Sequence, residues 1–132
     1  MTRRLSLACL LALAACESAA PTVTGVAPVS YDGVWTGVAQ RSQGGERTCP
    51  APTPFVVTIE NNVVRGEVRD RRNRDATVSR FDGVVDADGR LAFRAWYDSI
   101  RNDASLEYNG TRFSGRITNP NECIFTLRLS RG

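Results

Sequence analysis

The chain has 132 residues, of which 17 are arginine, 14 are aspartate or glutamate, and none is histidine or lysine. Its formal net charge of +3 depends on Arg3 and Arg4, which lie in a segment that we expect to be removed. The remaining chain is then close to neutral, and its charge gives no reason to expect a nucleic-acid partner.

The N-terminal segment has the order of a secretion signal. Arg3 and Arg4 precede an apolar run from Leu5 to Ala15, which is too short for a permanent transmembrane helix. The residues Leu13-Ala14-Ala15-Cys16 resemble the lipobox of bacterial lipoproteins, where a small residue precedes a cysteine that becomes the acylated N-terminus. The resemblance implies that residues 1–15 are a signal peptide and that Cys16 is the lipidation site.

The same resemblance implies a location. Acyl chains on Cys16 would anchor the protein in the membrane of a bacterial cell envelope, and we expect the outer membrane, facing the periplasm. The alternative is an ordinary signal-peptidase site after Ala14 or Ala15. In that case Cys16 would stay as a third cysteine, and an oxidising compartment would hold a protein with one thiol left without a disulfide partner.

The other cysteines predict a disulfide. Cys9 leaves with the signal and Cys16 carries lipid, so Cys49 and Cys123 remain as a single pair in a secreted domain. A metal site is the competing interpretation, but it needs further ligands and the chain has no histidine. We therefore expect a Cys49–Cys123 disulfide, no metal and no other cofactor.

Composition divides the remaining chain into two parts. Residues 16–30 are rich in alanine, proline, serine, threonine and glycine without a regular apolar period, which is typical of a flexible linker. From residue 31 to the C-terminus at residue 132, apolar and polar residues alternate, which is typical of half-buried β-strands. We therefore expect a lipid-anchored linker over 16–30 and one β domain over 31–132.

Turn signals at Asn61-Asn62, Ala87-Asp88-Gly89 and Asn109-Gly110 separate the alternating segments. The expected strands cover residues 33–40, 55–60, 63–68, 80–86, 90–97, 106–108, 112–117 and 123–131, and no segment has a helical period. Eight consecutive strands with short connections predict an all-β fold, a small eight-stranded up-and-down antiparallel barrel. A two-sheet β-sandwich is the alternative.

Four of the expected strands carry a glycine between two inward apolar residues. These triplets are Trp35-Gly37-Ala39, Val64-Gly66-Val68, Phe81-Gly83-Val85 and Phe113-Gly115-Ile117. Glycine at the same depth in several strands permits the tight coiling of a small barrel. The alternative is that the glycines leave a ligand cavity at mid-height.

The residues Gly33-Val34-Trp35 resemble the glycine-x-tryptophan motif of the calycin barrels, in which the tryptophan closes one end beneath an arginine from the last strand. The resemblance implies Arg128 or Arg131 for that arginine. The size of the domain is similar to that of the periplasmic metalloprotease inhibitors of Gram-negative bacteria, which are also small eight-stranded barrels with one disulfide. That similarity implies an inhibitor-like activity.

The residue types argue against catalysis. The inward positions of the expected strands are apolar, and the carboxylates fall on outward positions or in turns. A hydrolase needs a nucleophile beside a base or two carboxylates in one cleft, whereas Asp86, Asp88 and Gly89 have the pattern of a hairpin turn. We therefore do not expect an enzyme.

Two surface features are candidate partner-binding sites. The loop from Arg69 to Asp75 contains Arg69, Arg71, Arg72 and Arg74, and either it pairs its charges internally or it contacts an anionic lipid or an acidic envelope protein. Trp96 is expected to point outward, as a strand-packing residue or an aromatic anchor. Two functions stay open: an interaction or inhibitor module, or a binder of a small apolar ligand or lipid in the lumen.

Overall fold

The computed structural model describes residues 28–97 and 99–132. The predicted signal peptide, the lipidation site at Cys16 and nearly all of the predicted linker lie outside these residues. Those three statements therefore stay predictions.

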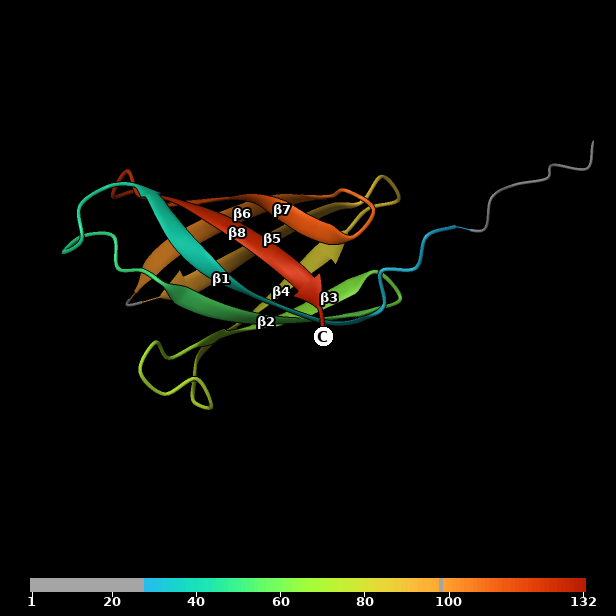
Figure 1. Ribbon diagram of the computed structural model, residues 1–132, viewed down its shortest axis with the longest axis horizontal. Helices are drawn as coiled ribbons and strands as arrows, with labels where there is room; N and C mark the ends of the chain where they lie inside the picture. The colour runs from blue at the N-terminus through green and yellow to red at the C-terminus, as the bar shows by residue number, and fades with distance from the viewer. Residues whose placement is uncertain (1–27, 98) are drawn as a thin grey trace, which may run out of the picture.

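The described chain forms a closed antiparallel barrel of eight strands (Figure 1). Each strand pairs with the next, and β8 pairs with β1 to complete the ring. The predicted barrel is confirmed, and the two-sheet alternative is wrong because the ring has no open edge. The strands are β1 (Gly33–Gln43), β2 (Thr53–Glu60), β3 (Val63–Arg69), β4 (Thr77–Val85), β5 (Arg90–Tyr97), β6 (Ile100–Tyr108), β7 (Arg112–Thr118) and β8 (Ile124–Arg131).

Alternation in the sequence corresponds closely to alternation in burial. Along β5, Leu91, Phe93 and Ala95 are buried while the residues between them are exposed. All buried apolar residues of the described chain lie between Tyr31 and Leu129. The barrel therefore contains its own hydrophobic core and meets the requirement for folding without the N-terminal segment.

The inward glycines allow neighbouring backbone and side chains to approach closely, and they leave no cavity above them. A β-carbon on Gly66 would overlap the ring of Phe81, which lies directly over it. A β-carbon on Gly37 would overlap the backbone carbonyl of Arg128, and one on Gly115 would overlap that of Ser105. These contacts support the interpretation that the glycines permit tight coiling of the wall.

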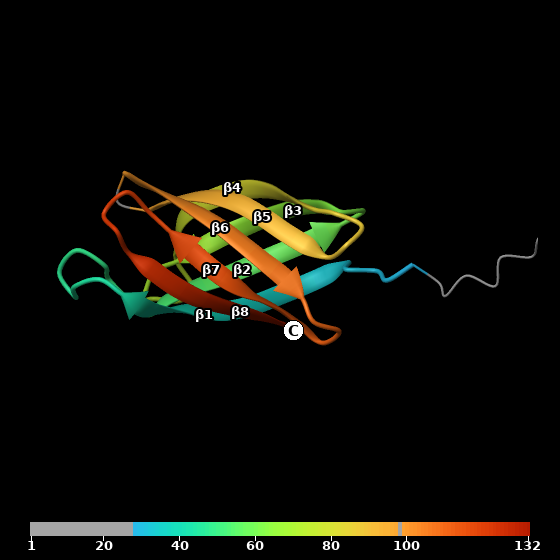
Figure 2. The same ribbon diagram turned by 90° about the horizontal axis from the view of Figure 1, so that it is seen from above.

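The barrel has two unlike ends (Figures 1 and 2). The turns β2–β3, β4–β5 and β6–β7 lie at one end together with the entry of the N-terminal segment, and we call this the closed end. The longer loops over residues 44–52, 70–76 and 119–123 lie at the other end, which we call the open end. Cys49 and Cys123 are bonded there, with 5.5 Å between their Cα atoms. The predicted disulfide therefore ties the β1–β2 loop to the β7–β8 loop.

Candidate functional site

The closed end is filled by aromatic side chains. Trp35 is fully buried, and its Nε1 donates a hydrogen bond of 2.8 Å to the carbonyl of Tyr31. The rings of Phe113 and Tyr108 meet it edge-on, with centroid separations of 4.9 Å and 6.0 Å. The packing leaves this end as a structural plug.

Arg131 lies over this plug. Its guanidinium carbon is 4.6 Å from the centroid of the Trp35 ring, and its Nη2 donates to the carbonyl of Ser30 at 3.1 Å. Of the two arginines that the calycin resemblance implied, Arg131 therefore occupies the position over the tryptophan. Arg128 is an exposed residue in the middle of β8.

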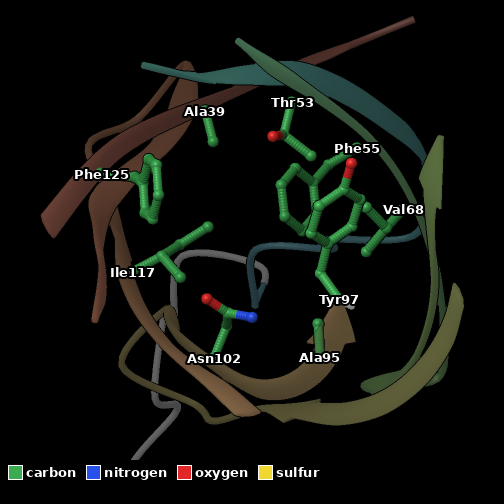
Figure 3. A pocket seen from close by; sticks show the side chains of 9 residues that line it. All are labelled: Ala39, Thr53, Phe55, Val68, Ala95, Tyr97, Asn102, Ile117 and Phe125. Carbon is green, nitrogen blue, oxygen red and sulfur yellow. The ribbon is translucent and has the colours of Figure 1, made fainter. Parts of the chain in front are cut away.

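The open end contains a small apolar cavity at the mouth of the barrel (Figure 3). Its volume is about 30 Å³. An apolar cavity that binds benzene measures roughly 150 Å³, and one water needs about 10–15 Å³. The lining residues are Ala39, Thr53, Phe55, Val68, Ala95, Tyr97, Asn102, Ile117 and Phe125.

Aromatic rings fill the middle of the lumen below this cavity. Phe81 and Phe93 stack with centroids 4.2 Å apart, and Phe55 lies 5.9 Å from Phe93 and 6.1 Å from Phe81. The space above the glycines is therefore occupied by side chains, and the described structure leaves no deep pocket at mid-height. The mouth is the part of the lumen that a ligand group can reach.

Two polar side chains face the lumen at the mouth. Asn102 and Thr53 are 9% and 8% exposed, so the prediction of a wholly apolar interior was wrong here. The Nδ2 of Asn102 donates to the carbonyl of Ile100 at 3.0 Å, and its Oδ1 accepts from Nδ2 of Asn119 at 3.1 Å. These bonds satisfy the amide next to solvent, where its desolvation costs less.

A sequence signal for Asn102 was available. Continuing the alternation backward from Leu106 through Ala104 reaches Asn102, but the expected strand began only at residue 106. In the structure β6 begins at Ile100. The polar residues Arg101, Asn102 and Asp103 obscured the start of this strand.

Arg71 and Tyr97 form the rim of the mouth. The Nη2 of Arg71 donates to Oη of Tyr97 at 3.2 Å, and its guanidinium lies 5.7 Å from the centroid of the Tyr97 ring. Tyr97 is partly buried and lines the cavity. On its outer side a second depression is lined by Ala51, Pro52, Asp70, Arg71, Arg72 and Tyr97. The mouth therefore has an apolar inner part and a charged outer part that share one tyrosine.

The structure divides the predicted arginine cluster. Arg69 ends β3, where it pairs with Glu67 and donates to the carbonyl of Asp75 at 2.9 Å, and Arg71 is held by Tyr97. Arg72 and Arg74 are exposed, and neither has an ion-pair partner within residues 28–97 and 99–132. Internal pairing therefore holds for Arg69 and Arg71, and does not hold for Arg72 and Arg74.

Asp70 organises the loop from inside. Its Oδ1 accepts hydrogen bonds of 2.7 Å from the backbone N–H groups of Arg72 and Asn73. Both bonds lower the pKa of Asp70 below its ordinary value of 3.8, and the bond from Asn73 has the larger effect. The loop thus presents Arg72 and Arg74 from a hydrogen-bonded turn.

Trp96 points outward from β5, as predicted, and is 51% exposed. Its register partner on β6 is Arg101. Arg94, two residues earlier on β5, and Arg101 both donate to Asp103, at 3.0 Å and 3.1 Å. Both bonds lower the pKa of Asp103 below its ordinary value, and the bond from Arg94 has the larger effect. Trp96 is therefore an exposed ring beside an arginine pair that shares a carboxylate.

The acidic turn at the closed end is structural. Asp86 accepts from the backbone N–H groups of Asp88 and Arg90 at 2.9 Å and 3.0 Å, which confirms the predicted hairpin turn. Over residues 28–97 and 99–132, no three histidine, cysteine, aspartate or glutamate side chains are grouped to hold a metal ion. The same residues include no helix of the length and apolarity that a membrane-crossing helix needs.

The fold and the mouth define the chain as a small antiparallel β-barrel with one disulfide-tied open end. Neither a protein-family model nor a curated protein matches it. It is similar to two solved structures described as redesigned beta barrels bound to DFHBI. The barrel mFAP1 has a TM-score of 0.50 at 16% identity over 76% of this chain and 94% of its own. The barrel mFAP0 has a TM-score of 0.49 at 14% identity over 76% of this chain and 97% of its own.

Proposed function

We propose that the protein is a non-catalytic binding module, lipid-anchored in a bacterial cell envelope, that engages a macromolecular partner with its open end. One observation carries the proposal: the lumen is filled, whereas the open end combines an apolar mouth with a charged rim. A partner side chain entering the mouth would meet Phe125 and Tyr97, and its neighbours would meet the arginines outside. Interfaces with protein partners draw most of their energy from such small, desolvated anchor positions.

The disulfide supports this proposal. It ties the loop over residues 44–52 to the loop over residues 119–123, so two of the loops that surround the mouth are held together before any partner binds. A preorganised rim loses less conformational entropy on binding. The loop over residues 70–76 is ordered separately by Asp70.

The proposed tether is also consistent with an available open end. Ser30 accepts from Arg131 at the closed end, so the chain that leads toward Cys16 leaves the barrel opposite the mouth. A lipid on Cys16 would therefore hold the protein at the membrane without covering the loops. An inhibitor-like activity on an envelope protein is the form of this function that the similarity to metalloprotease inhibitors implies.

A small apolar ligand or lipid is the second candidate. The mouth cavity is apolar with a few convergent polar groups, which is typical of ligand sites, and the similar barrel mFAP1 was solved with DFHBI bound. The volume of about 30 Å³ argues against it, because pockets for drug-sized ligands measure roughly 300–1,000 Å³. The macromolecular partner therefore explains the geometry better.

Affinity capture tests the proposal. The lipidated full chain is extracted from envelopes with its partners, and proteins and lipids are identified by mass spectrometry. A variant with Arg72→Glu and Arg74→Glu should lose the captured protein. Its free energy of unfolding should stay within about 1 kcal/mol of the wild type, because exposed substitutions cost little.

A matched control carries Arg65→Glu and Arg90→Glu, which change the charge equally on the barrel wall. This control should keep the partner. Equal capture by wild type and both variants would contradict the role of the open end. A stoichiometric lipid inside the barrel would favour the second candidate instead.

A further inference from the structure

One face of the outer surface of the barrel carries three exposed arginines that form no ion pair within the described residues. It is formed by outward residues between Arg112 and Arg116 on β7 and between Thr126 and Ser130 on β8, and we call it the arginine face. None of its side chains belongs to the large exposed apolar residues of the described chain. The face consists of Arg112, Ser114, Arg116, Thr126, Arg128 and Ser130.

Strand register places the three arginines close together. Arg128 pairs in register with Ser114, which lies between Arg112 and Arg116 on β7. Arg128 is therefore diagonal to both, with about 7–8 Å between diagonal residues of paired strands. Three exposed guanidinium groups thus form a triangle separated by hydroxyl side chains.

Arginines elsewhere on the wall face carboxylates. Arg65 on β3 pairs in register with Asp82 on β4, and Asp103 on β6 binds Arg94 and Arg101. By contrast β1, β7 and β8 contain no aspartate or glutamate. Within the residues that the structure describes, Arg112, Arg116 and Arg128 have no carboxylate within 4.0 Å. Glu107 of β6 is in register with Ser114 at the edge of this face, and its carboxylate lies 3.9 Å from Arg90. The three arginines therefore outnumber the carboxylates beside them, and this positive excess is complementary to anions.

We propose that the arginine face docks the barrel on a membrane surface by binding the phosphate groups of anionic phospholipids. One guanidinium group can donate two parallel hydrogen bonds to the oxygens of a phosphate group. The serine and threonine hydroxyls between the arginines add further donors. A protein partner is less suited, because the face has no aromatic or large apolar anchor. Charge complementarity without an anchor suits a lipid headgroup surface.

The position of the N-terminal segment agrees with this orientation. Ser30 contacts Arg131, and Gly132 donates to the carbonyl of Val34 at 2.8 Å, so the chain leaves the barrel beside the end of β8. A tether from Cys16, which is part of the proposed function, would therefore leave next to the arginine face. β8 lies between β1 and β7 (Figures 1 and 2).

The closed end itself is unsuited to an anionic surface. Four exposed carboxylates surround its turns, and Arg90, Arg112 and Arg131 lie at the same end. This end therefore offers no excess of positive charge to an anionic surface. Lying on the arginine face keeps these groups and the open end away from the headgroups. The carboxylates belong to Asp32, Glu60, Asp86 and Asp88.

Vesicle binding tests the proposal without the tether. The barrel over residues 28–132, which contains its whole core, is sedimented with vesicles of phosphatidylcholine containing about one third phosphatidylglycerol, at low salt. Binding should occur there and be absent from pure phosphatidylcholine. The variant with Arg112, Arg116 and Arg128 changed to Gln should bind about 100-fold more weakly, because each basic residue near the surface contributes about fivefold.

The control variant changes Arg65, Arg72 and Arg74 to Gln and removes the same charge elsewhere. It should bind vesicles within about threefold of the wild type. An equal loss in both variants would show that net charge alone acts and would overturn the proposal, as would wild-type binding that is absent or equal on both vesicle types. A triple variant that does not melt cooperatively is replaced by the three single Arg→Gln variants, each about fivefold weaker.

The outcome is separate from that of the capture experiment. The untethered barrel does not depend on Cys16, and the control variant removes the open-end arginines on which partner capture depends. Vesicle binding without partner capture would support the arginine face alone. Partner capture without vesicle binding would support the proposed function alone.

Discussion

The two ends of the barrel are formed by the same strands but differ in packing and polarity. At the closed end, Trp35 is fully buried among aromatic rings and covered by Arg131. At the open end, a cavity of about 30 Å³ remains, a buried amide faces the lumen, and the loops are held by a disulfide. Tight apolar packing at one end provides stability, so the other end can keep polar groups and an exposed rim. The contrast predicts where substitutions will unfold the protein and where they will change its surface.

The largest expected effect comes from the closed end. Trp35→Ala should lower the free energy of unfolding by about 5 kcal/mol, the upper end of the range for buried aromatic residues. It removes the plug and leaves the carbonyl of Tyr31 without its hydrogen bond. Urea denaturation, monitored by circular dichroism, measures this change in the free energy of unfolding. A loss below about 2 kcal/mol would show that the closed end is not the main support of the fold.

Removing the disulfide should have the next largest effect. Changing both Cys49 and Cys123 to Ser opens a loop with a sequence separation of 74, and the chain-entropy relation gives a loss of about 4 kcal/mol. The far-ultraviolet spectrum should be unchanged at low temperature, because the bond joins two loops and the eight strands pair without it. Mass spectrometry of unreduced peptides from the wild type should show the bond, and two free thiols there would contradict it.

The buried amide at the mouth should matter less. Asn102→Ala should cost about 1–2 kcal/mol, because it removes the hydrogen bond to the carbonyl of Ile100 and leaves Nδ2 of Asn119 without its partner. Asn119→Ala is the matched variant, and the double variant should cost less than the sum of the two. Strict additivity in urea denaturation would show that the two amides do not act as a pair.

The smallest effect concerns the pH dependence of the open-end loop. The pKa of Asp70 lies below 3.8 in the folded protein, so the folded state binds fewer protons than the unfolded state at acid pH. The contribution of Asp70 is complete above its unfolded pKa and is lost as the pH falls through the lower folded value. Asp70→Asn should therefore make the urea midpoint less sensitive to pH below about 4. Identical profiles for wild type and variant would contradict the role of this carboxylate.

Most of the wall could be predicted from alternation. The strand β5 was expected over residues 90–97 and lies there, with Leu91 and Phe93 inward. Alternation failed at the start of β6, where polar residues on both faces hide the period and Asn102 satisfies its amide through Asn119. Such a residue is recognisable only when its hydrogen-bond partner, 17 positions away in the chain, is known to be a neighbour.

The candidate sites show the same division between local and long-range information. Four arginines within six residues suggested one patch, but Arg69 turned to Glu67 and Arg71 turned to Tyr97, which lies on another strand. The arginine face has no local sequence signal, because Arg112 and Arg116 come from β7 and Arg128 from β8. They become neighbours only through the register of the two strands.

Alternation and cysteine number were enough to establish the class of fold, the inward residues of most strands and the Cys49–Cys123 pair, because each depends on side-chain chemistry along a single segment. Closure of the ring decided the rest: that Arg131, not Arg128, covers Trp35, that Phe81 fills the space over Gly66, and that the lumen retains only a shallow mouth. The physical reason is that register and coiling bring together residues far apart in the chain, and those contacts leave no period in the sequence.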